Sequence, residues 1–239
     1  MSHLHIPDGV LPLWLVAAGW IITGLILTFC IYRLKKFELM RKIPLIGIVS
    51  ALMIVTMTLP VIPLAYHINL SVVAGIILGP ALAFISVFIV DLIIAMFGHG
   101  GITVVGLNTL VVGSEAVLGF FLFRFFKSVL GPGSLGWSSG IAAVLSLILS
   151  TSVLIGVVYT SQISPEVIVE TTEHAHEPGS AHSEETPAPK QEGNLKGFIK
   201  TIIALLAFGW VLEGAVTGLV VNYVSRLRPD IISPEDGGG

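Results

Sequence analysis

The sequence is poor in charged residues and has a single cysteine. Of its 239 residues, 11% are Asp, Glu, Lys or Arg, and Cys30 lies inside an apolar run. One thiol excludes a disulfide framework and leaves the redox compartment undetermined. The net charge of -3, with no groove-sized cluster of Lys and Arg, argues against nucleic acid as a partner.

Familiar catalytic motifs are also absent. There is no G-x-x-x-x-G-K-[ST] phosphate loop, and the nearest glycine-rich stretch, GPGSLG at 131–136, lacks the lysine and is expected to lie in a turn. No H-E-x-x-H zinc-protease motif occurs, and no serine nucleophile with a matching base can be identified from spacing. We therefore expect that the chain is not an enzyme and does not hydrolyse ATP by itself.

Long apolar runs, in contrast, are abundant. Hydrophobic residues make up 54% of the chain and the mean hydropathy is +0.94, which predicts an all-α polytopic membrane protein. No basic region precedes the first run, so we expect a retained helix and not a cleaved signal peptide. Seven transmembrane helices are expected, near Leu11–Tyr32, Ile43–Tyr66, Leu70–Gly79, Ala81–Phe97, Thr103–Phe126, Gly140–Ser161 and Phe198–Val224.

The third expected helix is too short to cross a hydrocarbon core of about 30 Å. We expect it to be a short buried span or half of a re-entrant hairpin with the fourth helix. Gly79-Pro80 separates the two, because proline cannot donate the helical hydrogen bond and restricts the residue before it.

Clusters of basic residues indicate the orientation. They follow the first, fifth and seventh expected helices: Arg33, Lys35, Lys36, Arg41 and Lys42; Arg124 and Lys127; Arg226 and Arg228. Seven spans place all three clusters on the cytoplasmic side, with the N-terminus outside and the C-terminus inside. Merging the third and fourth helices would put the second cluster on the opposite side. The implied segments are an outer N-terminal segment (1–10), helices one to six (11–161), an outer loop (162–197), helix seven (198–226) and a cytoplasmic tail (227–239).

In this topology all the histidines fall on the outer face: His3, His5, His67, His99, His174, His176 and His182. Several imidazoles favour nickel, copper, zinc or cobalt over magnesium or calcium. His3 lies two residues from the Met1 amine, where amine, amides and imidazole can form a planar nitrogen set; if Met1 is removed, His3 directly follows the new amine. The last three histidines lie in an acidic stretch rich in Pro, Ser and Thr, which is either a solvated, loosely metal-attracting loop or a defined site.

The stretches HIPDGVLP, YHINLS and HGGITVVGLNTL together resemble the CbiM/NikM family, the substrate-capture components of energy-coupling-factor importers of cobalt and nickel. The resemblance covers most of the chain up to the fifth helix. It implies a seven-helix capture subunit in the plasma (inner) membrane of a prokaryote, with Co(II) or Ni(II) as transported substrate and no organic cofactor. The implied partners are two ATPase subunits, a coupling transmembrane subunit and often a small accessory membrane subunit.

The resemblance also implies the metal ligands. In the family these are the N-terminal amine, the amide and imidazole of the second-residue histidine, and a histidine at the end of the second helix. Matched by motif, the imidazoles are His5 and His67. This chain departs from the pattern because MSHL precedes His5, and Leu4 has no free amine. His3 with the Met1 amine is therefore a competing ligand pair.

Other residues of these blocks have alternative interpretations. Asp8 and Gly9 can form a tight turn that folds the N-terminal segment onto the helices. His99 is a ligand, a donor to one, or simply a helix end. Asn108 either fixes the tautomer of a ligand histidine or makes a packing hydrogen bond. Gly47 and Ala51 have small-xxx-small spacing, which suits docking of a partner helix.

Three acids lie within apolar runs: Asp91, Glu115 and Glu213. Such groups either line a proton or cation path or are structural hydrogen-bonding groups, and we favour the second interpretation. The first belongs to the main alternative function, a self-sufficient proton- or gradient-coupled metal transporter or channel. A metal sensor would need a large cytoplasmic output region, for which the tail after Arg228 is too short. The sequence thus favours capture of Co(II) or Ni(II) from the outer face.

Overall fold

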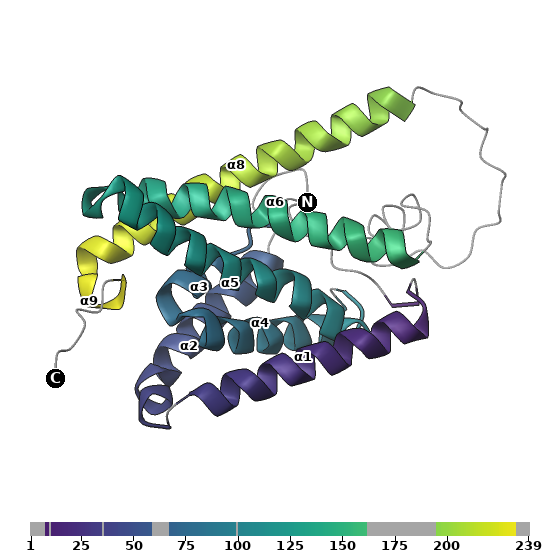
Figure 1. The fold of residues 1–239 in the computed structure, drawn as a ribbon, viewed down its shortest axis with the longest axis horizontal. Helices are drawn as coiled ribbons and strands as arrows, with labels where there is room; N and C mark the ends of the chain where they lie inside the picture. The colour runs from purple at the N-terminus through teal and green to yellow at the C-terminus, as the bar shows by residue number, and fades with distance from the viewer. Residues whose placement is uncertain are drawn as a thin grey trace.

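The protein is described by a computed structural model that covers residues 8–9, 11–34, 36–58, 67–98, 100–161 and 195–232. Secondary structure in these residues is entirely helical (Figure 1). The main helices are α1 (Leu13–Arg33), α2 (Lys36–Thr58), α3 (Ser71–Leu78), α4 (Pro80–Met96), α5 (Val105–Leu130), α6 (Leu135–Ser161) and α8 (Leu195–Leu227). Two short helices, η1 (Pro132–Ser134) and α9 (Pro229–Ile232), follow α5 and α8.

Helix length and composition agree with the predicted class, a multi-pass membrane protein. Within the described residues, α1, α5, α6 and α8 are long and apolar enough to cross a membrane, and α2 and α4 include shorter apolar segments. The predicted extension of the second helix over 59–66, the outer loop over 162–194 and the tail over 233–239 lie outside the described residues, as do Met1, His3, His5 and His99.

The short third helix lies at the centre of the bundle. Every residue of α3 except Ile77 is buried, and α3 contacts α2, α4, α5, α6 and α8. At Gly75 an added Cβ would lie 2.1 Å from the carbonyl oxygen of Ala116 in α5, so only glycine permits this approach. The prediction of a short buried segment is confirmed.

The chain changes direction between α3 and α4, as Gly79-Pro80 predicted. Gly79 has φ +83°, a conformation that other residues rarely adopt, and Pro80 begins α4 at a position that needs no backbone donor.

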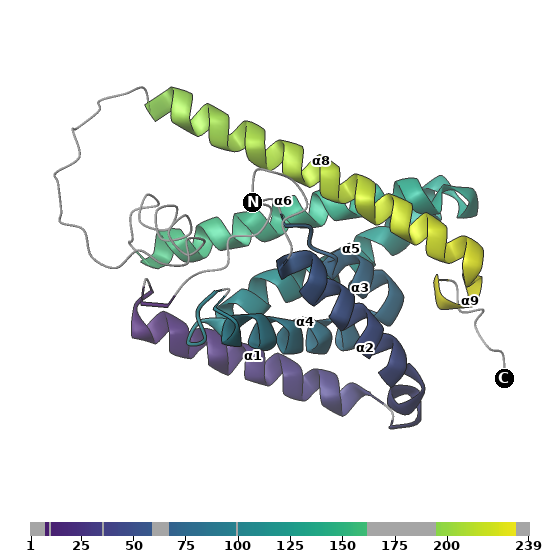
Figure 2. The same ribbon diagram turned by 180° about the vertical axis from the view of Figure 1, so that it is seen from behind.

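One end of the molecule brings together several helix ends (Figures 1 and 2). These are the end of α1, the start of α2, the junction of α5 with α6, and α9.

The start of α6 differs from the prediction. GPGSLG was interpreted as a turn and the helix was expected from Gly140, but α6 begins at Leu135. Gly131 and the short helix η1 make the turn, while Gly136 and Gly140 belong to α6 and face two glycines of α8. An added Cβ at Gly140 would lie 3.0 Å from the Gly214 oxygen, and one at Gly218 would lie 2.8 Å from the Gly136 oxygen. These glycines allow two membrane helices to approach closely, which local sequence alone cannot distinguish from a turn.

Candidate functional site

Asp8 fastens the segment before α1 to the segment before α5. Its Oδ2 accepts a hydrogen bond from Ile102 N at 3.0 Å, and its Oδ1 accepts one from Thr103 N at 2.9 Å and another from the Thr103 hydroxyl. Asp8 and Gly9 form the predicted turn, with Gly9 at φ +82°. The block containing HIPDG is therefore attached to the block containing HGGIT, far away in sequence.

Gly101 makes this attachment possible. An added Cβ on Gly101 would lie 2.2 Å from Asp8 Oδ1 and 2.5 Å from Asp8 N, so a larger residue would displace the segment. Burial raises the pKa of Asp8, but hydrogen bonds from Thr103, Ile102 and Val104 outweigh it and hold the pKa below the ordinary value of 3.8. Asp8 is thus ionised at neutral pH and accepts all its bonds as a carboxylate.

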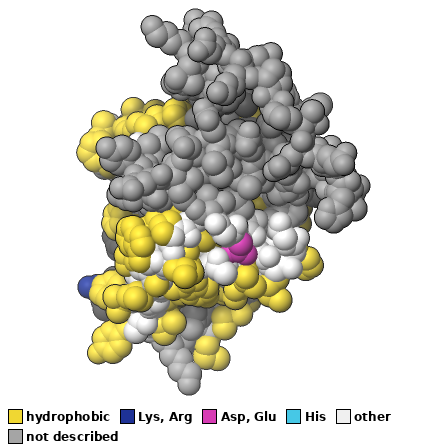
Figure 3. Space-filling view, turned by 90° about the vertical axis from the view of Figure 1, so that its right-hand side faces the viewer, with side chains coloured by type: hydrophobic (Ala, Val, Ile, Leu, Met, Phe, Trp, Pro, Cys, Tyr) yellow, Lys and Arg dark blue, Asp and Glu magenta, His cyan; other side chains and the backbone are white. Residues whose placement is uncertain are grey.

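Next to the attachment through Asp8, the backbones of α1 and α5 pack closely against each other. The indole N–H of Trp20 donates to Thr103 O at 2.6 Å, and the buried hydroxyl of Thr23 donates to Gly106 O at 2.7 Å. An added Cβ on Gly106 would lie 2.8 Å from Trp20 N. This contact fixes the position of the loop that holds Asp8. The described surface around the end of the molecule where α1 begins is largely hydrophobic or uncharged (Figure 3).

His67 is half-buried and lies in the non-helical residues 67–70, which lead into α3. Two residues later, buried Asn69 connects this segment to two other helices. Its backbone N–H donates to Glu213 Oε1 of α8 at 3.1 Å, and its Nδ2 lies 3.4 Å from Glu115 Oε1 of α5. Asn69 Oδ1 accepts from Ser71 N at 2.8 Å, where α3 begins. The backbone that carries His67 is therefore held by two buried carboxyl groups.

Of the three acids within apolar runs, Glu115 and Glu213 converge on this segment, and both are fully or almost fully buried. Glu115 Oε1 also accepts the Ser71 hydroxyl at 2.6 Å. Asp91 is buried elsewhere, where its Oδ2 accepts the Thr109 hydroxyl at 3.0 Å between α4 and α5. Each of the three carboxyl groups accepts at least one hydrogen bond.

The remaining candidate residues, Asn108, Gly47 and Ala51, lie on two different helices. Asn108 is buried in α5, next to Thr109. Gly47 and Ala51 are exposed on α2, and nothing lies within 4 Å of a Cβ added at Gly47, so this face is open. Among the described residues, no group of three or more His, Cys, Asp or Glu side chains is arranged to hold a metal ion. The other proposed ligands, Met1, His3 and His5, lie outside the described residues, as does His99.

Several residues of the site were not predicted from the sequence: Asn69, Ser71, Gly101 and Thr103. The signal for two of them was available, because Asn69 and Ser71 belong to the YHINLS stretch that also contains His67. Gly101 and Thr103 belong to HGGIT, but their partner Asp8 lies 95 positions before Thr103. No local pattern indicates such a pairing.

A protein-family model described as "CbiM: Cobalt uptake substrate-specific transmembrane region" matches residues 5–231. The chain is 26% identical to a putative metal transport protein of Haloquadratum walsbyi, covering 96% of this chain and 93% of that protein. It is 26% identical to the cobalt transport protein CbiM of Geobacter sulfurreducens, covering 99% and 64% of the two chains. It is 28% identical to a putative fused nickel transport protein NikMN of Archaeoglobus fulgidus, covering 99% and 70%.

Solved structures show the same fold. The crystal structure of a transition metal transporter aligns with a TM-score of 0.65 at 20% identity, covering 93% of each chain. A truncated transition metal transporter aligns with a TM-score of 0.64 at 21% identity, covering 93% of this chain and 99% of the other.

Proposed function

The chain belongs to the CbiM family of cobalt uptake substrate-specific transmembrane regions, and on this basis we propose that it captures Co(II) or Ni(II) from the outer face of the membrane. In this proposal it is the substrate-binding subunit of an energy-coupling-factor importer, and the ion is its transported substrate. The observation that carries the proposal is the attachment of Asp8 to Ile102 and Thr103, because it fixes the point from which segment 1–7 extends.

The proposed ligands combine a fixed residue with the N-terminal segment. His67 lies on a backbone immobilised through Asn69, Glu115 and Glu213, which suits a ligand that must keep its position when the site is empty. The second imidazole is His5, or His3 with the terminal amine of Met1. Amine and amide nitrogens with imidazole form the planar set that a d8 ion prefers.

The proposed roles of the neighbouring residues follow from their positions. Asp8 acts by holding the segment, and contributes no bond to the ion. We assign Asn108 and His99 to orienting a ligand imidazole, since an imidazole that binds a metal donates its other N–H to a nearby acceptor. Substitution of Asp8, Asn108 or His99 should therefore weaken binding of the metal ion without changing the number of protein atoms that coordinate it.

We further propose seven spans, with the N-terminus outside and the C-terminus cytoplasmic, divided as the sequence suggested. The arrangement of basic side chains supports this topology: Lys42 at the start of α2 lines the same pocket as Arg124 and Lys127 at the end of α5. Two helices, α3 and α4, separate α2 from α5. If they formed one continuous span, the two groups would lie at opposite ends of the molecule.

Partner subunits must supply the energy, because the sequence contains no phosphate-binding loop. We propose two ATPase subunits and a coupling membrane subunit, with the open α2 face at Gly47 and Ala51 as a docking surface. The name of the Archaeoglobus fulgidus relative, a fused NikMN protein, supports a small accessory membrane component as well. The outer loop over 162–197 is the segment of this chain that we assign to a similar role.

Reconstitution distinguishes capture from the alternative, a self-sufficient gradient-coupled transporter. The chain alone in proteoliposomes should bind Ni(II) or Co(II) but accumulate neither, with or without a proton gradient. Uphill flux should appear only with the ATPase and coupling subunits and ATP. Accumulation by the chain alone, abolished by Glu115→Gln or Asp91→Asn, would instead establish the alternative.

A further inference from the structure

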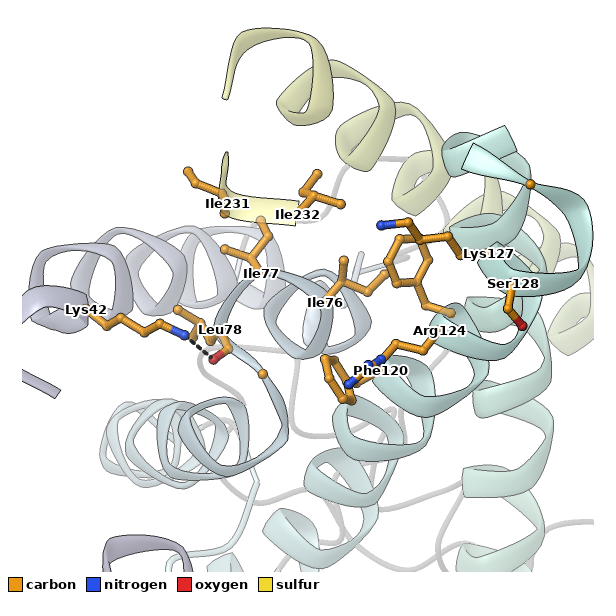
Figure 4. Close-up of a pocket in the computed structure, with 13 residues that line it drawn as sticks. Lys42, Ile76, Ile77, Leu78, Phe120, Arg124, Lys127, Ser128, Ile231 and Ile232 are labelled. Carbon is orange, nitrogen blue, oxygen red and sulfur yellow. Dashed lines mark hydrogen bonds between the residues drawn. The ribbon is translucent and has the colours of Figure 1, made fainter. Parts of the chain in front are cut away.

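A basic pocket of the described structure is lined by none of the proposed metal ligands. The pocket, of about 690 Å³, opens at the end of the molecule where α2 begins and α5 ends (Figure 4). Three cationic side chains line it: Lys42, Arg124 and Lys127. Lys42 approaches from one side, and the other two approach from α5 on the opposite side (Figure 4).

The rest of the described lining is apolar or uncharged, and none of the 13 described lining residues is acidic. The apolar part consists mainly of Ile76 and Ile77 from α3, Phe120 and Phe123 from α5, and Ile231 and Ile232 from α9. A pocket with cations on two sides and hydrocarbon between them suits a ligand that is both anionic and apolar. A small inorganic anion would leave most of the apolar surface unused.

Lys42 and Arg124 are positioned so that they can still bind a ligand. Lys42 Nζ donates one hydrogen bond to Leu78 O, at 3.4 Å, and an ammonium group has three donors. The guanidinium of exposed Arg124 lies over the Phe120 ring, with 5.7 Å from Cζ to the ring centroid. Stacking of this kind occupies the face of the guanidinium and leaves the N–H groups at its edge available to an oxyanion.

We propose that this pocket binds the phosphate headgroup of an anionic phospholipid from the surrounding bilayer. The headgroup phosphate lies between Lys42 and the α5 cations, and the start of the acyl chains contacts the isoleucines and phenylalanines. The location fits, because basic pockets between transmembrane helices at headgroup depth recognise such lipids. Since the lining joins α2, α3, α5 and α9, a bound lipid would hold these helix ends together. The proposal goes beyond metal capture and uses none of the proposed metal ligands.

The test compares two lipids with the same acyl chains. The purified full chain in neutral detergent is titrated with phosphatidylglycerol or phosphatidylcholine, and retained lipid is counted by native mass spectrometry. We expect the intact chain to retain phosphatidylglycerol preferentially. Loss of one cation in Arg124→Gln should weaken this binding roughly fivefold, and replacing Lys42, Arg124 and Lys127 together by Gln should abolish the preference.

Arg33→Gln is the matched control. Arg33 also lies at a helix end over a phenylalanine ring, 5.0 Å from Cζ to the Phe29 centroid, but it does not line the pocket. It should leave lipid retention unchanged. Equal loss in the two variants would show only general charge attraction and would overturn the proposal. Arg124→Lys, which keeps the charge, should retain most of the binding and shows whether the Gln variant fails for reasons of folding.

Two further outcomes would also contradict the proposal. Equal retention of both lipids by the unaltered chain would do so without any variant. Displacement of phosphatidylglycerol by millimolar inorganic phosphate would identify a site for the free anion instead. If the pocket variants keep the lipid but no longer assemble with a membrane partner, the pocket binds an acidic segment of that partner, and the lipid assignment is wrong.

Discussion

The attachment of the N-terminal segment through Asp8 gives the most direct mutational test of the proposed site. Asp8→Ala removes all three hydrogen bonds to Ile102 and Thr103. Asp8 is exposed, so each bond is valued at about 1 kcal/mol, near the middle of the usual net range. The sum is about 3 kcal/mol of lost docking energy.

The lost docking energy weakens metal binding if the ion binds only when the N-terminal segment is docked. The apparent Kd then rises as the docked fraction falls, by up to about 100-fold for 3 kcal/mol. Thr103→Val removes only the hydroxyl bond and should raise Kd roughly fivefold. The appropriate assay is isothermal titration of the untagged chain with Ni(II).

Thr56→Val provides the control for this series. The Thr56 hydroxyl bonds only within α2, to Leu52 O and Met53 O, so its loss should leave Kd unchanged. The reasoning would be refuted if Asp8→Ala bound Ni(II) within twofold of the unaltered chain, or if Thr56→Val had as large an effect as Thr103→Val.

The other predictions concern the helix contact, the buried carboxyl groups and pH. Gly106→Ala should lower the free energy of unfolding by about 1–3 kcal/mol in thermal unfolding, because the added Cβ would meet the backbone at Trp20. Gly24→Ala is the control and should be neutral or stabilising, because nothing lies within 4 Å of a Cβ added there. Ser71→Ala should cost about 1.5–3 kcal/mol through the lost bond to Glu115, while Ser152→Ala, an exposed intrahelical case, should cost little. The lowered pKa of Asp8 means that docking is stabilised above pH 3.8 and lost as pH falls through the lower folded-state value. Imidazoles titrate between about pH 7.5 and 5.5, so metal affinity should fall over this range in the unaltered chain and in Asp8→Asn alike. If the fall disappeared in Asp8→Asn, the assignment of this pH dependence to the imidazoles would be wrong.

The sequence predicted features that depend on local chemistry. Gly79-Pro80 marked the break before α4, and the length of Leu70–Gly79 indicated a short buried helix, because proline and helix length act within a few residues. Asp8-Gly9 was a recognisable turn for the same reason. The apolar runs also indicated which parts of the chain form membrane helices.

Features that depend on distant partners could not be predicted in the same way. GPGSLG was interpreted as a turn, which is right for residues 131–134, yet Gly136 lies in α6, where Gly218 of α8 approaches its backbone. The three buried acids were recognised as unusual, but only the fold shows that Glu115 and Glu213 converge on Asn69. Sequence identifies a costly buried carboxyl group, and packing determines what it bonds.

The central claim, capture by the N-terminal segment together with His67, is tested most directly by titrating the purified untagged chain with Ni(II) and recording its absorption spectrum. Mass spectrometry of the N-terminus shows whether Met1 is retained and so which residue carries the amine. The account predicts a single tightly bound ion with the yellow, diamagnetic signature of square-planar nitrogen ligation, lost in His67→Ala and on blocking the amine. Several weakly held ions with octahedral spectra, unaffected by His67→Ala, would contradict it.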